Sequence, residues 1–306
     1  MNAPVAPDTR PLSWYEASAR QRVAALADSG SFVEFIGPER RETSPHLAIF
    51  DLPEQFDDGM IVGRVTLDGR AVLVAAQEGR FMGGAFGEVH GAKLTGLLRA
   101  ARALGRDVLI LFDTGGVRLQ EANAGELAIA EILRALVEAR AAGVEVIGLI
   151  GGRAGCYGGG GLIAGSCSTL IISEQGRLGV SGPEVIETNE GVEEFDSRDR
   201  ALVWRTMGGK HRYLIGGADA FVDDDAAAFR KAAIEAFDGG ARFEFATLEA
   251  EQQRLERRLR RFGGARDATD IWAGLGVTEP AEVPGLATEE FLRRAADKRE
   301  TADEAR

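Results

Sequence analysis

"VEVIGLIGGRAGCYGGGGLIAGSCSTLIIS", residues 144–173, contains two short apolar runs separated by a glycine-rich segment. The runs VEVIGLI and TLIIS predict buried strands, and the segment between them predicts a loop followed by a helix. Four consecutive glycines, Gly158–Gly161, stand where this helix begins, although each glycine costs a helix about 0.5–1 kcal/mol relative to alanine. The backbone at this helix start must therefore approach another group closely.

The same alternation continues on both sides of this stretch. Residues 60–77 form two apolar runs around Asp68-Gly69, which is a hairpin signal. A helix is predicted from about Glu88, a buried strand in DVLILFDTGG (residues 107–116), and a further helix that ends at Gly143. Strands that alternate with helices predict an α/β fold with a parallel or mixed sheet.

The remainder of the chain is predicted to be mainly helical. Residues 184–237 read as helices broken at glycine pairs, and residues 243–262 as an amphipathic helix whose basic run RLERRLRR faces solvent. We therefore expect three parts, which are an N-terminal helix and extension (1–58), a central domain (59–240) and a C-terminal helical extension (241–306).

Composition excludes several classes of protein. The chain has 306 residues, a formal net charge of −12 and no basic face rich in aromatic residues, so nucleic-acid binding is not expected. No apolar run approaches the roughly 20 residues of a membrane helix, and the first residues lack the pattern of a secretory signal. Two cysteines form neither a disulfide framework nor a four-ligand zinc site. A cytoplasmic protein without a membrane contact or a metal is the simplest expectation.

Three glycine clusters, Gly83-Gly84, Gly115-Gly116 and Gly158–Gly161, lie beside predicted helix starts. Helix N-termini expose unpaired N–H groups, which bind anions or stabilise an oxyanion. One alternative is a nucleotide site, but the chain has no phosphate-loop motif, and residues 159–164, which fit G-x-G-x-x-A, begin too far after the strand for a dinucleotide turn. The other alternative is that the glycines serve only tight turns and helix packing.

The motifs FMGGAFGEVHGAKL (81–94), TGGVRLQEA (114–122) and CYGGGGLIAGSCSTLII (156–172) resemble, in order and spacing, the N-terminal half of the carboxyltransferase family. The resemblance covers about residues 60–225 and implies the crotonase-like fold, a spiral of ββα units, here with a C-terminal helical region. Within the family the chain most resembles the β subunits of biotin-independent malonate decarboxylases. It lacks a four-cysteine zinc ribbon and holds one carboxyltransferase half, so a second crotonase-like subunit, the γ subunit of such decarboxylases, is the implied partner.

The resemblance also implies the chemistry. Such a subunit decarboxylates a malonyl thioester, carried on an acyl carrier protein, to the acetyl thioester and CO₂. The chain itself would bind no cofactor, because the substrate is carried on a phosphopantetheine-type arm derived from dephospho-CoA, or on CoA. A biotin-dependent carboxyltransferase subunit and a non-catalytic scaffold subunit stay open as alternatives.

The resemblance and the backbone argument point to two sets of site residues. The expected oxyanion donors, and hence catalytic residues, are Gly116, Val117, Gly159 and Gly160. The expected substrate contacts are Gly83, Gly84, Gly115, Arg118, Tyr157, Gly158, Ser181 and Gly182.

Other polar residues near these motifs have simpler interpretations. Arg118 is a structural ion pair, with Glu121 or Glu126, unless it faces the phosphopantetheine or the carboxylate. His90 is interpreted as a satisfied buried histidine and Lys93 as a solvated or ion-paired side chain. Nothing near Cys156 lowers its pKa, so it is not expected to be a nucleophile.

Overall fold

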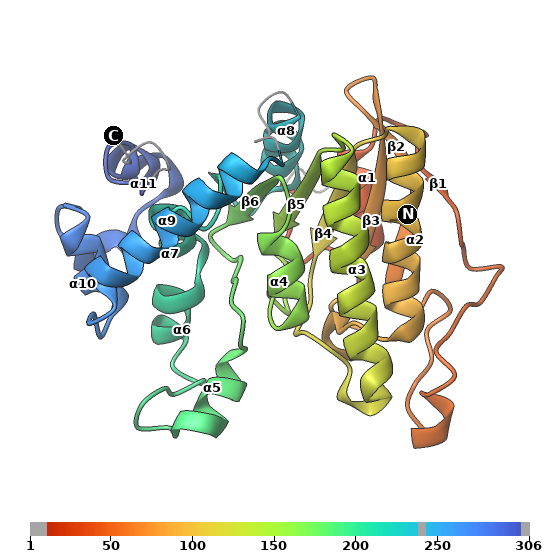
Figure 1. Cartoon of the computed structure of the whole chain (residues 1–306), viewed down its shortest axis with the longest axis horizontal. Helices are drawn as coiled ribbons and strands as arrows, with labels where there is room; N and C mark the ends of the chain where they lie inside the picture. Colours follow the sequence, from red (N-terminus) through yellow and green to blue (C-terminus); the bar gives the residue numbers. More distant parts are fainter. Residues whose placement is uncertain (1–10, 238–242, 301–306) are drawn as a thin grey trace, which may run out of the picture.

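A computed structural model describes residues 11–237 and 243–300. Its centre is one seven-stranded sheet in which the strands lie side by side in the order of the sequence (Figure 1). The strands are β1 (Val33–Glu34), β2 (Met60–Leu67), β3 (Arg70–Gln77), β4 (Val108–Phe112), β5 (Val146–Ile150), β6 (Thr169–Ser173) and β7 (Ala220–Val222).

The hairpin and the parallel strands were correctly predicted. β2 and β3 pair antiparallel, and Asp68 and Gly69 at the turn both have positive φ (51° and 78°), as a tight hairpin turn requires. From β3 to β7 every pairing is parallel. The prediction of a helical segment over 184–237 was wrong at β7, which is too short to leave an alternating pattern.

Helices cover both faces of the sheet, because both faces are apolar. Alternate residues of the strands face α2 (Glu88–Leu104), α3 (Asn123–Ala141) and α4 (Gly159–Gly165) on one side. The intervening residues face α1 (Ala19–Leu26) and α8 (Ala226–Ala236) on the other side. This period of two is the signature of strands buried on both faces. The expected mixed α/β fold is thus confirmed.

The remaining helices gather at the β7 edge of the sheet (Figure 1). They are α5 (Pro183–Glu190), α6 (Arg200–Met207), α7 (Gly209–Leu214), α9 (Phe245–Phe262), α10 (Ala268–Gly274) and α11 (Thr288–Ala295). Single 3-10 turns lie at Ala48–Phe50, Met82–Gly84, Leu119–Glu121 and Pro280–Gly285. Within the described residues no helix is long and apolar enough to cross a membrane.

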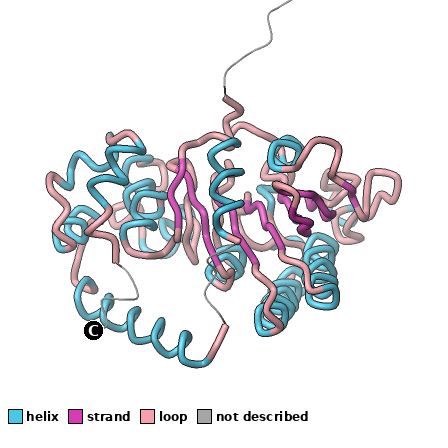
Figure 2. Tube along the Cα trace, turned by 90° about the horizontal axis from the view of Figure 1, so that it is seen from above, coloured by secondary structure: helices cyan, strands magenta, loops and turns pink. Residues whose placement is uncertain are grey.

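The predicted helix over 243–262 is confirmed as α9, and Figure 2 shows it at the margin of the molecule. Its apolar residues remain open to solvent, with Phe245 82% and Leu259 71% exposed. The expectation that its basic run is solvated was wrong for Arg254, which is buried and donates to Ile215 O at 3.2 Å. The expected domain boundary at residue 240 lies outside the described residues.

Candidate active site

Loops that follow neighbouring parallel strands run side by side at one edge of the sheet. Isolated bridges join Thr114 to Cys156 and Cys156 to Leu178. Thr114 N–H donates to Gly155 O at 2.8 Å, and Tyr157 N–H donates to Thr114 O at 3.0 Å. The loops after β4, β5 and β6 therefore share one backbone framework at the carboxyl ends of the strands, where parallel α/β sheets bind their ligands.

The N–H groups of the loop after β4 differ in whether they have a hydrogen-bond acceptor within the chain. Gly115 N–H donates to Gly83 O at 2.8 Å, and Gly116 N–H donates to Thr114 Oγ1 at 3.1 Å. Val117 N–H has no acceptor within residues 11–237 and 243–300. Of the expected donors in this loop, Val117 is therefore the open one. Gly116 supplies the conformation, because its φ of 128° is one that side chains rarely adopt.

The glycine run after β5 supplies the second set of open donors. The N–H groups of Gly158, Gly159 and Gly160 precede the first bond of the helix, which Gly161 donates, and they have no acceptor in the described part of the chain. A Cβ added to Gly158 would lie 3.2 Å from the Cα of Gly116. The two glycine loops are thus in backbone contact.

Close packing within the chain, which the sequence left open as one explanation for these glycines, applies to most of them. A Cβ on Gly159 would lie 2.6 Å from the side chain of Ile129, and one on Gly160 would overlap the methyl group of Thr114. Gly158 has a φ of 56°. The start of α4 therefore packs directly on the loops and on α3, and this contact already accounts for glycine at these positions.

Three of the expected substrate contacts, Gly83, Gly115 and Gly182, do leave open space. Nothing lies within 4 Å of a Cβ built on Gly83, and the nearest atom to one on Gly115 is Gly83 O at 3.6 Å. Gly84 differs, because its Cβ would overlap the carbonyl of Asp113. An added Cβ on Gly182 has its nearest atom 3.8 Å away, so the chain leaves room for another molecule beside Gly83, Gly115 and Gly182.

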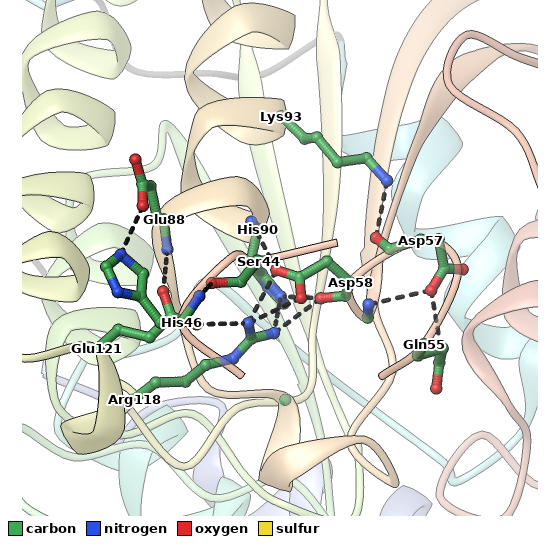
Figure 3. A network of polar contacts seen from close by, with 12 residues as sticks. Ser44, His46, Gln55, Asp57, Asp58, Glu88, His90, Lys93, Arg118 and Glu121 are labelled. Atoms are coloured by element: carbon green, nitrogen blue, oxygen red, sulfur yellow. Dashed lines mark hydrogen bonds and ion pairs between the residues drawn. The ribbon is translucent and has the colours of Figure 1, made fainter. Parts of the chain in front are cut away.

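A buried ion network lies beneath the first loop (Figure 3). The Arg118 guanidinium donates to both carboxylate oxygens of Asp58 at 2.9 and 2.8 Å and to Glu121 at 3.0 Å, and all three side chains are fully buried. Glu121 in turn accepts from Glu88 N–H at 2.6 Å at the start of α2. The expected ion pair with Glu121 is confirmed, and Asp58 is a partner that the sequence did not reveal. The Arg118 charge is thus neutralised by side chains of the chain itself.

His90 completes this network as a neutral side chain. Its Nδ1 donates to Asp58 O at 3.0 Å, and its Nε2 accepts from Gln77 Nε2 at 3.2 Å. Burial, and then the charge of Arg118, hold the pKa of His90 well below its usual value. Gln77 also donates to Gly84 O, so the network reaches the glycine loops. The interpretation of His90 as a satisfied buried histidine is confirmed.

The interpretation of Lys93 was wrong. Its side chain is neither solvated nor part of an ion pair within the described residues, but is buried and donates from Nζ to Asp57 O at 2.8 Å. Burial lowers the pKa of Lys93. The helical position of Lys93 in the sequence carries no sign of this contact, because Asp57 precedes it by 36 residues.

Cys156 and Tyr157 are both enclosed by the protein. Burial raises the pKa of the Cys156 thiol well above its usual value, which keeps the thiol protonated and agrees with its interpretation as unreactive. Burial raises the pKa of Tyr157 to about 12. The Tyr157 hydroxyl is shielded from solvent and has no hydrogen-bond partner among residues 11–237 and 243–300.

Ser181 and Gly182 follow β6 and lead into α5. Gly182 is the N-cap residue of α5 and Pro183 its first residue, as expected. A Cβ on Gly182 would reach the Tyr157 ring at 4.0 Å. The segment is thus a neighbour of the glycine loop through Tyr157.

Asp113, at the start of the loop after β4, was not singled out from the sequence, although it bonds to three other segments of the chain. Its carboxylate accepts from Arg22 at 2.7 Å and from Ala154 N–H at 2.7 Å, and its own N–H donates to Gln77 at 3.2 Å. The available signal was an acidic residue directly after a fully apolar strand. In the part of the chain that the structure describes, no three His, Cys, Asp or Glu side chains are grouped to hold a metal.

Comparisons with known proteins agree with this arrangement. Residues 16–234 match the model of the carboxyl transferase domain. The chain is 38% identical over 308 residues to the malonyl-S-ACP:biotin-protein carboxyltransferase MADC of Malonomonas rubra, covering 92% of this chain and 95% of that protein. It is 31% identical to the propionyl-CoA carboxylase beta chain of Saccharopolyspora erythraea, of which it spans only 38%.

Solved structures give the same result. A chain of the Pseudomonas malonate decarboxylase hetero-tetramer in complex with malonate matches with a TM-score of 0.77 and 40% identity, over 84% of this chain and 95% of that chain. The transcarboxylase 12S structure matches with a TM-score of 0.61 and 27% identity, over 71% and 40%. These neighbours are crotonase-fold proteins, and their chemistry is carboxyl transfer or decarboxylation. The chain therefore belongs to the carboxyltransferase family and is an enzyme of this type, close to malonate decarboxylase.

Proposed function

We propose that the chain is the β subunit of a malonate decarboxylase that acts on a malonyl thioester of an acyl carrier protein. The C–C bond to the carboxylate breaks, CO₂ leaves, and the electron pair forms the enolate of the acetyl thioester, which then takes a proton. The observation that carries the proposal is the set of open backbone donors on two touching loops, Val117 N–H and those of Gly158–Gly160. One such donor contributes about 2.7–4 kcal/mol to the stability of an oxyanion.

A second subunit is part of the proposal. Large apolar side chains are exposed on and beside the loops, namely Leu119 (83%), Leu127 (65%), Leu162 (47%) and Val180 (67%). Such a surface is typical of a protein interface. The solved relatives are a hetero-tetramer and a hetero-dimer. We assign this surface to a second crotonase-like chain, the γ subunit, and the complex to the cytoplasm.

Two glycine substitutions that cause similar backbone strain, one at the site and one far from it, test the oxyanion donors. Gly158→Ala in the assembled complex should lower kcat on malonyl thioester about 10²–10³-fold, because a side chain at φ 56° moves the donors of the glycine run. Gly69→Ala is the control, since its φ of 78° carries similar strain at a distant, open turn. A folded, assembled Gly158→Ala complex that turns over within a few-fold of the parent would refute the proposed donor set.

A second candidate function is carboxyl transfer to a biotin carrier. The observation that favours it is the identity to MADC, whose name describes that reaction. Avidin, which sequesters biotin carriers, distinguishes the two. Turnover that persists in avidin supports the decarboxylase, and turnover that avidin abolishes supports the transferase. A complex with no turnover on either route would leave the scaffold alternative.

A further inference from the structure

A groove of about 390 Å³ lies between α7, α9 and α10, away from the described donors. Its walls are largely apolar and come from Leu255, Leu259 and Phe262 on α9 and from Ile271 on α10. Two guanidinium groups, those of Arg212 and Arg258, also line it. The groove thus combines positive charge with apolar surface in a chain of net charge −12.

Arg212 is unusual among the enclosed arginines. Its Nε is shielded from solvent, and its guanidinium forms no hydrogen bond or ion pair within residues 11–237 and 243–300. Arg22 and Arg118, in contrast, are each paired with a buried carboxylate. Burial, and then the charge of Arg258, lower the pKa of Arg212 to about 10. An anion would supply a partner for this shielded N–H group and for the positive charge.

Arg258 faces the same groove and is only partly neutralised. Its Nη1 donates to Ile215 O at 2.7 Å and lies 3.7 Å from the carboxylate of Glu300. Burial and the neighbouring Arg254 lower its pKa. Arginine is well suited to bind a phosphate, which accepts several charge-assisted hydrogen bonds at once, and the groove is lined by two of them.

Tyr157 connects the groove with the glycine loops. It directly precedes Gly158. Burial raises the pKa of the Tyr157 phenol, and the charges of Arg177 and Arg212 oppose this shift. Its hydroxyl has no partner in the part of the chain that the structure describes. Tyr157 is thus the residue of the glycine loop on which the charge of Arg212 acts.

We propose that Arg212 and Arg258 bind the phosphate of a phosphopantetheine-type arm, and that the apolar wall of α9 contacts the gem-dimethyl part of the same arm. This inference rests on the proposed function for the nature of the ligand. The phosphate has two sources, the prosthetic group of a carrier protein and free CoA thioesters, and both present the same chemistry to the groove.

Calorimetric titration of the full-length protein with 4′-phosphopantetheine and with pantetheine tests the site. The parent should bind the phosphorylated probe about tenfold or more tightly than the other. Arg212→Met and Arg258→Met should abolish this preference. Arg260→Met, which removes an equal charge from the exposed side of α9, should retain it. Equal binding of both probes by the parent, or an unchanged preference in Arg212→Met, overturns the proposal.

Thermal unfolding without ligand separates binding from a structural role. Arg212→Met should unfold at the parent temperature or above it, because it removes an uncompensated charge. A marked decrease would instead show that Arg212 stabilises the fold, and would overturn the proposal. Turnover then identifies the source, since a loss confined to malonyl-carrier substrate indicates the carrier, and a loss with malonyl-CoA indicates the free thioester.

The two proposals can fail separately. If the phosphorylated probe is preferred but no malonyl thioester is turned over, the proposed function fails and the anion site stands. If turnover is normal but the preference is absent, the anion site fails and the function stands.

Discussion

The glycine loops and α9 differ in how far the chain itself pairs their arginine side chains and covers their apolar ones. In the loops the backbone is joined by isolated bridges, and the Arg118 guanidinium beneath them is paired with the Asp58 and Glu121 carboxylates. On α9 large apolar residues such as Leu259 face solvent, and Arg212 beside it has no partner in the described residues. The family match covers the loops and ends at residue 234, before α9. The charge beneath the loops is thus paired within one chain, whereas the arginine beside α9 has no such pair within residues 11–237 and 243–300.

The strongest test of this contrast is to break the ion network beneath the loops. Arg118→Met leaves the Asp58 and Glu121 carboxylates buried without a cation, so it should destabilise the fold by about 3–5 kcal/mol in denaturant unfolding. Arg134→Met is the control, because its ion pairs with Glu131 and Glu138 are exposed and should contribute no more than about 1 kcal/mol. Similar losses in both variants would contradict the contrast.

A second test asks whether the helices around α9 are packed as firmly as the loops. His211 on α7 is buried and accepts from Trp272 on α10 at 3.2 Å, and its pKa is lowered to about 3, chiefly by burial. The unfolded chain takes up this proton near pH 6.5, but the folded protein does not until about pH 3. The stability from neutral His211 is therefore complete above pH 6.5 and is lost progressively as the pH falls towards 3.

The variant His211→Gln isolates this effect. Between pH 6.5 and pH 5 the parent should lose about 2 kcal/mol relative to the variant, as measured by the free energy of unfolding at each pH. A stability difference that does not change with pH would mean that α7 and α10 open readily. These two helices would then be packed less firmly than the loops.

The smallest effect is expected on α9 itself. Leu259→Ser should change the unfolding free energy of the isolated chain by no more than about 0.5 kcal/mol, because the side chain is 71% exposed. Leu98→Ala on α2, where the side chain is fully buried, should cost about 2–5 kcal/mol. If Leu259→Ser destabilises the isolated chain as much as Leu98→Ala does, then α9 is part of the core and presents no free surface.

Local signals explain what the sequence could predict. The hairpin at Asp68-Gly69 and the helix start at Glu88 depend on neighbouring residues, and both were correctly placed. The positions of the glycine loops also followed from local pattern. The pairing of Asp58 with Arg118 joins residues 60 positions apart, so no local pattern encodes it.

The packing contacts of the glycines could not be predicted for a similar reason. The sequence shows that Gly159 must lack a side chain, but it does not show that Ile129 is the group which requires this. The burial of Lys93 and Arg254 was equally hidden, because long charged side chains on helices usually lie in water.

The agreement between strand order and sequence order has a consequence for synthesis. Each strand, as the ribosome releases it, finds its only earlier neighbour already made, so the sheet can grow one strand at a time. One contact that cannot form in this order is the stack of Trp14 on Phe229, with ring centroids 4.3 Å apart, which joins the N-terminal segment to α8. That contact must wait until more than 200 further residues have been translated, so the first segment of the chain is fixed only after the sheet has grown.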